Sequence, residues 1–158
     1  MIYELKLNKA EAYMKAALFV AANIALPHLF HLIPGGGVMF LPIYFFTIIA
    51  AMRYGWQLGM LTAVMTPLMG NLLFGAPVAA MIPDMLLKGA ILSASAALAV
   101  KKMGTTFAAS FCAVLGAWLF VGLLEWPFTG AAYAFQDFVT GVPGLILMIV
   151  GSYLVNKL

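Results

Sequence analysis

The sequence predicts an all-α, polytopic membrane protein with six transmembrane helices, and two of its features carry that prediction. Of its 158 residues, 65% are hydrophobic and only 8% are charged, whereas a soluble domain carries about a quarter charged residues. The apolar residues also form long runs, which are typical of bilayer-spanning helices. At roughly 20 residues per span with short loops, the chain forms a single domain, 1–158, of about six helices.

Glycine, proline and charged residues divide the chain into six apolar segments. The expected helices cover residues 10–33, 38–52, 56–74, 78–100, 105–124 and 135–155. The first ends at Pro34 and the glycines after it, the fourth at Lys101-Lys102 and the fifth at Glu125-Trp126-Pro127, because proline and consecutive glycines interrupt helices. The second segment is short for a span, so we expect it to be tilted or to lie partly within protein.

The basic residues support six spans and orient them. With six spans, both termini and the loops after the second and fourth helices lie on one side of the membrane. Every basic residue except Lys88 falls on that side: Lys6, Lys9, Lys15, Arg53, Lys101, Lys102 and Lys157. The positive-inside rule therefore predicts that both termini are cytoplasmic. The same residues are too few and too scattered to follow the phosphates of a nucleic acid.

Three acidic residues gather at the opposite, outer ends of the helices. Asp84, Glu125 and Asp137 lie near the outer ends of the fourth, fifth and sixth expected spans. Ionisable groups in or near a membrane are costly and often mark functional sites. Asp84 and Lys88 are four residues apart on one helix face. They either pair with each other, which lowers the cost of placing Lys88 in the membrane, or hold a polar or zwitterionic ligand.

Four more residues near the outer side are candidate ligand contacts, each with a structural alternative. Phe40 and Trp126 either stack against a flat ligand or belong to an interfacial aromatic belt. Asn71, a lone amide in an apolar helix, faces either another helix or the ligand. His31 shares a helix face with His28, and the two either contact a ligand (a metal or haem iron included) or pack at the interface. We expect no metal site, because further metal ligands are missing.

An alanine stripe on the first helix suggests a close helix–helix contact. Ala12 and Ala16, then Ala17, Ala21 and Ala25, recur at intervals of four, and small residues at this spacing allow backbones to approach closely. The stripe either packs within this chain or docks on a separate membrane protein. The sequence has neither a GxxxxGK[ST] phosphate loop nor an HExxH motif, so we expect neither an ATPase nor an enzyme, and no cofactor.

The chain resembles the substrate-binding S-components of energy-coupling factor (ECF) transporters, which are bacterial vitamin importers. Three stretches carry the resemblance: Ala17-Leu-Phe-Val-Ala21, which is similar to the AxxxA docking stripe of that family; the region from Phe40-Leu-Pro-Ile-Tyr44 through Arg53-Tyr-Gly-Trp-Gln-Leu-Gly59 and Thr66-Pro67-Leu68 to Leu72-Leu-Phe-Gly-Ala-Pro77; and Gly141-Val-Pro-Gly-Leu-Ile-Leu147. Together they extend over nearly the whole chain.

The resemblance implies a multi-pass protein of the bacterial cytoplasmic membrane that captures a vitamin or cofactor precursor from outside. Its partners would be a transmembrane coupling subunit, docked through Ala17 and Ala21, and two ATPase subunits. The ligand site would lie in the outward half, among Asp84, Lys88, Glu125, Trp126 and Asp137, beneath the loop that includes His31.

The ligand class is open at this point. Nickel and cobalt members of the family begin Met-His, whereas this sequence begins Met1-Ile2, so we expect an organic ligand. Three outer acids against one base favour a neutral or cationic flat heterocycle, such as a queuosine-type precursor, over a polyanion such as folate. The alternatives to an importer subunit are an autonomous small-solute transporter or channel and, less favoured, a membrane-embedded enzyme.

Overall fold

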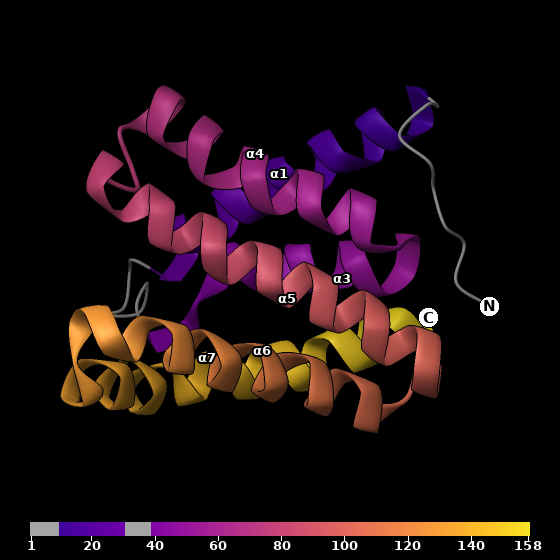
Figure 1. Cartoon of the computed structure of the whole chain (residues 1–158). Coiled ribbons are helices and arrows are strands. Elements are labelled where there is room, and N and C mark those ends of the chain that lie inside the picture. Colours follow the sequence, from indigo (N-terminus) through magenta and orange to yellow (C-terminus); the bar gives the residue numbers. More distant parts are fainter. Residues whose placement is uncertain (1–9, 31–38) are drawn as a thin grey trace.

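The described part of the chain is a bundle of α-helices (Figure 1). The computed structural model describes residues 10–30 and 39–158. In this part the helices are α1 (Ala10–Phe30), α3 (Phe45–Tyr54), α4 (Trp56–Phe74), α5 (Ile82–Met103), α6 (Phe107–Thr129) and α7 (Ala131–Lys157). Two 3-10 turns, η1 (Pro42–Tyr44) and η2 (Ala79–Met81), lead into α3 and α5. These residues include no β-strand, so the all-α prediction is confirmed for them.

Four helical segments of the described chain are long and apolar enough to cross a membrane. They are Trp56–Phe74, Ala79–Met103, Phe107–Thr129 and Phe135–Lys157, which makes the chain a multi-pass membrane protein. The short second segment contains α3, whose 10 residues are too few for a full span and are mostly buried in the bundle. The burial of α3 in the bundle therefore agrees with the expectation that a segment too short for a full span lies partly within protein. The six-span topology, with α1 and the segment containing α3 as the other two crossings, stays a prediction.

Two predicted helix ends are wrong. The third expected helix coincides with α4, but α6 continues through Glu125-Trp126-Pro127 to Thr129, and α5 continues through Lys101-Lys102 to Met103. A proline this near a C-terminus removes only one hydrogen bond of the last turns. The helix instead ends at Gly130, whose φ of 85° suits glycine. Glu125 is therefore held on a helix rather than in a loop.

The two ends of the bundle carry opposite charge. The start of α1 and the C-terminus lie at the same end, together with the α3–α4 and α5–α6 turns (Figure 1). We call this the basic end, because the last turns of α3, α5 and α7 bring Arg53, Lys101, Lys102 and Lys157 there. The α4–α5 and α6–α7 turns lie at the opposite end, which we call the acidic end because Asp84 lies in the first turn of α5 and Glu125 near the end of α6 there. The basic and acidic residues are thus separated between the two ends as the sequence predicts.

A close backbone contact places the segment before α3 directly on α7. A Cβ added at Gly144 of α7 would lie 2.5 Å from the carbonyl oxygen of Phe40, so only glycine leaves room there. Gly141, one turn earlier, faces the side chain of Leu41 in the same way, with 3.0 Å to its Cδ1. These contacts seat η1 between α7 and the rest of the bundle, and they bring Tyr44 inside it.

A buried amide joins α1, α3 and α4. Asn23 Nδ2 donates to the hydroxyls of Thr47 at 3.0 Å and Thr66 at 3.3 Å, and its Oδ1 accepts from the N–H of Phe46 at 2.9 Å. Phe46 lies in the first turn of α3, where backbone N–H groups have no partner within the helix. The N-cap residue Tyr44 makes no side-chain cap, so the cap for α3 comes from α1.

Replacing this amide will weaken the bundle. We expect Asn23→Leu to lower the free energy of unfolding by about 1–3 kcal/mol, because it leaves a buried N–H without an acceptor. Thr62→Val is the matched control, since the Thr62 hydroxyl bonds only to Leu58 O of its own helix. Thermal unfolding in detergent measures both variants. Equal melting temperatures for Asn23→Leu and the wild type would contradict the assignment of Asn23 as the cap of α3.

Candidate functional site

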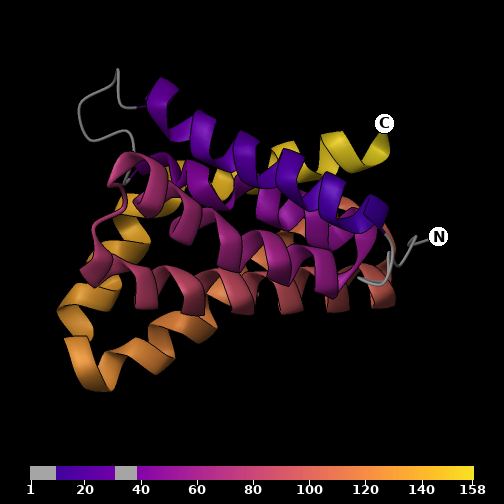
Figure 2. The same cartoon turned by 90° about the horizontal axis from the view of Figure 1, so that it is seen from above.

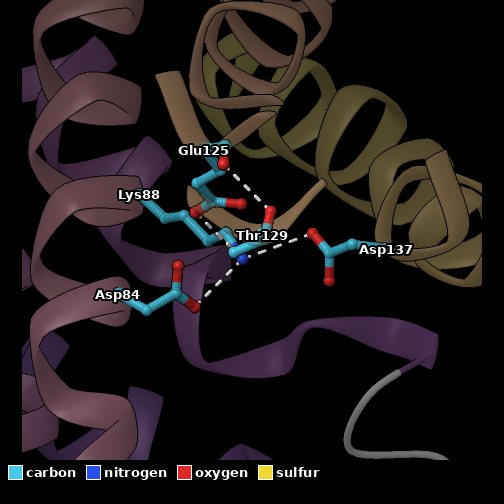
Figure 3. Close-up of polar contacts among 5 residues, drawn as sticks. All are labelled: Asp84, Lys88, Glu125, Thr129 and Asp137. Atoms are coloured by element: carbon cyan, nitrogen blue, oxygen red, sulfur yellow. Dashed lines mark hydrogen bonds and ion pairs between the residues drawn. The ribbon is translucent and has the colours of Figure 1, made fainter. Parts of the chain in front are cut away.

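One lysine and three carboxylates from three helices meet near the acidic end. Lys88 and Asp84 come from α5, Glu125 from α6 and Asp137 from α7. Lys88 Nζ lies 3.0 Å from Asp84 Oδ2, 3.3 Å from Asp137 Oδ2 and 3.5 Å from Glu125 Oε1. Figure 3 shows the ammonium at the centre of the three carboxylates, with Asp84 and Asp137 on opposite sides of it. We call these four residues the acidic cluster.

Lys88 is committed to these partners. The residue is 5% exposed, and a buried ammonium without counter-charges is costly. An ammonium has three N–H donors, which matches the three carboxylates around it. Of the two alternatives for Asp84 and Lys88, the structure thus contains the internal ion pair and extends it to two further helices. Lys88 thus donates a hydrogen bond to Asp84 and forms ion pairs with Asp137 and Glu125.

The acidic cluster has more negative charge and more hydrogen-bond acceptors than Lys88 satisfies. With all three carboxyl groups in their ionised form, the cluster has a formal charge of −2. Glu125 is 9% exposed, and its Oε1, which lies 3.5 Å from Lys88 Nζ, has no hydrogen-bond donor among the described residues. Buried acceptors normally have a donor. The cluster therefore has the electrostatic character of a binding site for a cation.

Two buried aromatic residues pack together in the core. Tyr44 of η1 is 5% exposed. Its ring meets that of Trp118 of α6 edge to face, with 5.6 Å between centroids. Trp118 is 4% exposed, and its indole N–H, which lies beside Gly141, has no hydrogen-bond partner in the part of the chain that the structure describes.

Sequence reasoning did not select Tyr44 or Trp118 as site residues. Tyr44 was one of many aromatic residues near the outer side. Trp118 precedes Glu125 by seven positions, a spacing that places both on one helix face. That spacing was the available signal, but the expected fifth helix ends at residue 124, one position before Glu125.

The other predicted ligand contacts are not brought to the cluster. The ring of Phe40 packs on Phe30, with 4.8 Å between centroids. Asn71 Nδ2 donates to Pro77 O at 2.8 Å and so holds the α4–α5 turn. Trp126 follows Glu125 on α6 but is 54% exposed. His31 lies outside the described residues.

The alanines of α1 divide into two stripes. Ala12 and Ala16 are buried against α3 and α4, whereas Ala17 and Ala21 are exposed. The exposed pair lines an apolar groove of about 900 Å³ between α1 and α4, and Figure 2 shows these two helices side by side along one edge of the bundle. The two interpretations of the alanines thus apply to different residues: Ala12 and Ala16 pack internally, and Ala17 and Ala21 remain open to a partner.

Within residues 10–30 and 39–158, no group of three His, Cys, Asp or Glu residues is arranged to hold a metal ion. His28 Nδ1 lies 2.8 Å from Ile24 O, and its ring packs edge-on against Phe74. These contacts give His28 a structural role at the mouth of the α1–α4 groove.

No protein-family model matches the chain, and no curated protein sequence or solved structure is significantly similar to it.

Removing the central charge of the cluster will destabilise the protein. We expect Lys88→Met to lower the free energy of unfolding by about 3–5 kcal/mol, because three carboxylates then lie together without a counter-charge. Lys102→Met, at an exposed lysine of the same helix, is the control and should change it by less than about 0.5 kcal/mol. Adding Glu125→Gln to Lys88→Met should recover part of the loss. If both lysine variants unfold alike in detergent, Lys88 does not hold the three helices together.

Proposed function

We propose that the protein is the substrate-capture subunit of an ECF-type importer, which binds a vitamin or cofactor precursor from outside the cell. The observation that carries the proposal is the position of the acidic cluster, near the end of the bundle opposite the basic end. With the basic end in the cytoplasm, the cluster lies in the outward half of the bacterial cytoplasmic membrane, where an importer first meets its solute. The chain acts as a binding subunit and is not an enzyme.

The apolar interior supports a capture subunit over an autonomous channel. A channel lines its path with polar groups or water along its whole length. Between the cluster and the basic end, most side chains of the described core are apolar, among them Ile48, Leu92 and Met148, and the buried hydroxyls of Ser93 and Ser152 bond to carbonyls of their own helices. A solute held at the cluster therefore has no polar route through this packed core. It needs a partner to complete its transfer.

The exposed alanine stripe supports a membrane partner. Lipid tails are as apolar as the helices, so association of helices in a membrane depends on close packing, for which small residues are suited. Ala17 and Ala21 lie exposed in a groove that Ala16 and Ala25 also line, together with larger side chains such as Leu61. In the proposed importer, the coupling subunit docks at this stripe, and two ATPase subunits on the cytoplasmic side supply the energy.

Ligand capture is tested on the purified protein. We expect native mass spectrometry of the detergent-solubilised chain to detect a bound organic molecule of vitamin size, and Glu125→Gln to reduce its occupancy. A protein that purifies empty, and that no member of a panel of vitamins and nucleobases stabilises against heat, contradicts the capture function.

Docking is tested by separating binding from uptake. Ala21→Trp fills the exposed stripe, so we expect cellular uptake of the bound molecule to fall by about tenfold or more because the partner helix no longer approaches closely. Binding by the purified variant should be unchanged, since Ala21 is remote from the acidic cluster. Leu119→Trp, at an exposed position on α6, is the matched control and should import normally. Normal uptake by Ala21→Trp rules out docking through this stripe.

A further inference from the structure

We infer that the basic end binds an anionic phospholipid, whose phosphate is held by Arg53 and Lys157 and whose acyl chains lie on exposed apolar side chains of α6 and α7. The inference goes beyond solute capture and does not depend on it, because it concerns the opposite end of the bundle. Two independent features carry it: basic side chains that pair with no acidic side chain of the described chain, and an apolar surface that continues directly from them.

The acidic side chains of residues 10–30 and 39–158 are all engaged elsewhere. Asp84, Glu125 and Asp137 form the acidic cluster, and Glu11 pairs with Lys15 at 2.7 Å. The exposed basic residues in the last turns of α3, α5 and α7 form no salt bridge with a described side chain; they are Arg53, Lys101, Lys102 and Lys157. The basic end therefore has an excess of positive charge that an anion from outside the chain can offset.

Two of these cations lie beside the last turn of α7. Arg53 Nη1 donates to Val155 O at 3.3 Å. Lys157 Nζ lies 3.4 Å from the hydroxyl oxygen of Tyr153 and 5.6 Å from the centre of its ring. A guanidinium has five N–H donors and an ammonium has three, and each of these hydrogen bonds uses one. Arginine and lysine are the side chains that bind phosphate oxygens most readily, so this turn is suited to a phosphate group.

An apolar surface continues from this turn toward the middle of the bundle. The ring of Tyr153 meets that of Phe107, the first residue of α6, edge to face, with 5.7 Å between centroids. One turn further in, Phe111 of α6 and Val150 of α7 are 46% and 42% exposed, and their spacing from Phe107 and Tyr153 places them on the same helix faces. The surface is thus cationic at the helix ends and apolar below them, which matches the headgroup and the acyl chains of a phospholipid.

The two parts of this surface together distinguish a lipid from a soluble partner. An acidic protein would satisfy the cations but would leave Phe111 and Val150 uncovered, whereas a neutral lipid would cover the apolar side chains and leave the cations without a counter-charge. Basic residues at a membrane surface attract anionic lipids, and aromatic rings such as that of Tyr153 favour the depth of the headgroups. An anionic phospholipid matches both parts.

The bound lipid would link helices that share few polar contacts. Arg53 ends α3, whereas Lys157 belongs to α7, and the direct hydrogen bond between these helices is 3.3 Å long. A phosphate that accepts from both side chains adds a second, charge-assisted link. Binding should therefore raise the melting temperature of the protein, and this rise provides the measurement.

Three probes with matched chemistry test the inference on the full-length chain in a neutral detergent. They are dioleoylphosphatidylglycerol, dioleoylphosphatidylcholine and glycerophosphoglycerol, which has the anionic headgroup but no acyl chains. Each is added at the same concentration of phosphate, and thermal unfolding and native mass spectrometry measure stabilisation and retained molecules. We expect only dioleoylphosphatidylglycerol to stabilise the protein and remain bound, and we expect its effect to weaken as the salt concentration rises.

Charge-neutral variants locate the site. Arg53→Gln and Lys157→Gln should each weaken binding of dioleoylphosphatidylglycerol by about fivefold, the effect of one cation at a membrane surface. Lys15→Gln is the matched control, because it removes the same charge from the same end at a lysine that pairs with Glu11, and it should bind the lipid as the wild type does. Lys157→Gln leaves the hydrogen bond between Arg53 and Val155 in place, so it tests the site without loss of that contact between helices.

Four outcomes would overturn the inference. Equal stabilisation by the zwitterionic lipid would remove the role of charge, and equal stabilisation by glycerophosphoglycerol would make the site one for a free phosphate ester. If Lys15→Gln weakens binding as much as Lys157→Gln does, the lipid responds to net charge and not to a site at the end of α7. If dioleoylphosphatidylglycerol neither stabilises the protein nor stays bound, the basic end holds no lipid, and an acidic protein surface becomes the better partner for it.

Discussion

The acidic end of the molecule depends on the ammonium group of Lys88. Placing one cation among Asp84, Glu125 and Asp137 joins α5, α6 and α7 through groups that are costly to leave unpaired in a medium without water. The ion pairs hold the carboxylates close together despite their mutual repulsion. The arrangement therefore concentrates negative charge at one point of an otherwise apolar body. The proposed capture function depends on that concentration.

Much of the site was predictable from sequence because its members carry charge. Asp84, Lys88, Glu125 and Asp137 stand out in a chain with few ionisable residues, and the span order places the ends of their helices together. Sequence alone does not predict that Lys88 pairs with all three carboxylates. That arrangement depends on the rotation of α6 and α7 about their own axes, which decides where Glu125 and Asp137 point. Phe40, Asn71 and Trp126 were harder to place, because aromatic and amide side chains satisfy structural roles and ligand contacts equally well.

The helices themselves were predictable to differing degrees. The bounds of α4 coincide with an apolar run that glycine interrupts on both sides, which is a strong local signal. The end of α6 lies beyond the position that Pro127 predicts, because a proline in the last turns of a helix removes only one hydrogen bond. Asn23 gave no signal as a cap, since it caps α3 across a sequence separation of 23 residues. Such a contact depends on tertiary packing rather than on neighbouring residues.

The two polar centres, at Asn23 and at Lys88, belong to different sets of helices. Asn23 of α1 forms hydrogen bonds with residues of α3 and α4. Lys88 of α5 forms ion pairs with residues of α5, α6 and α7. The seam between these halves is largely apolar, and the polar contacts from Arg53 to Val155 O and from Ser110 to Met52 Sδ that cross it are long, at 3.3 Å and 3.7 Å. The two halves are therefore joined chiefly by close apolar packing, in which glycines of one half fit against the other half, as Gly144 does against Phe40 and Gly89 against Ala63. A bulkier residue at either glycine would separate the two halves before it disturbed either polar centre.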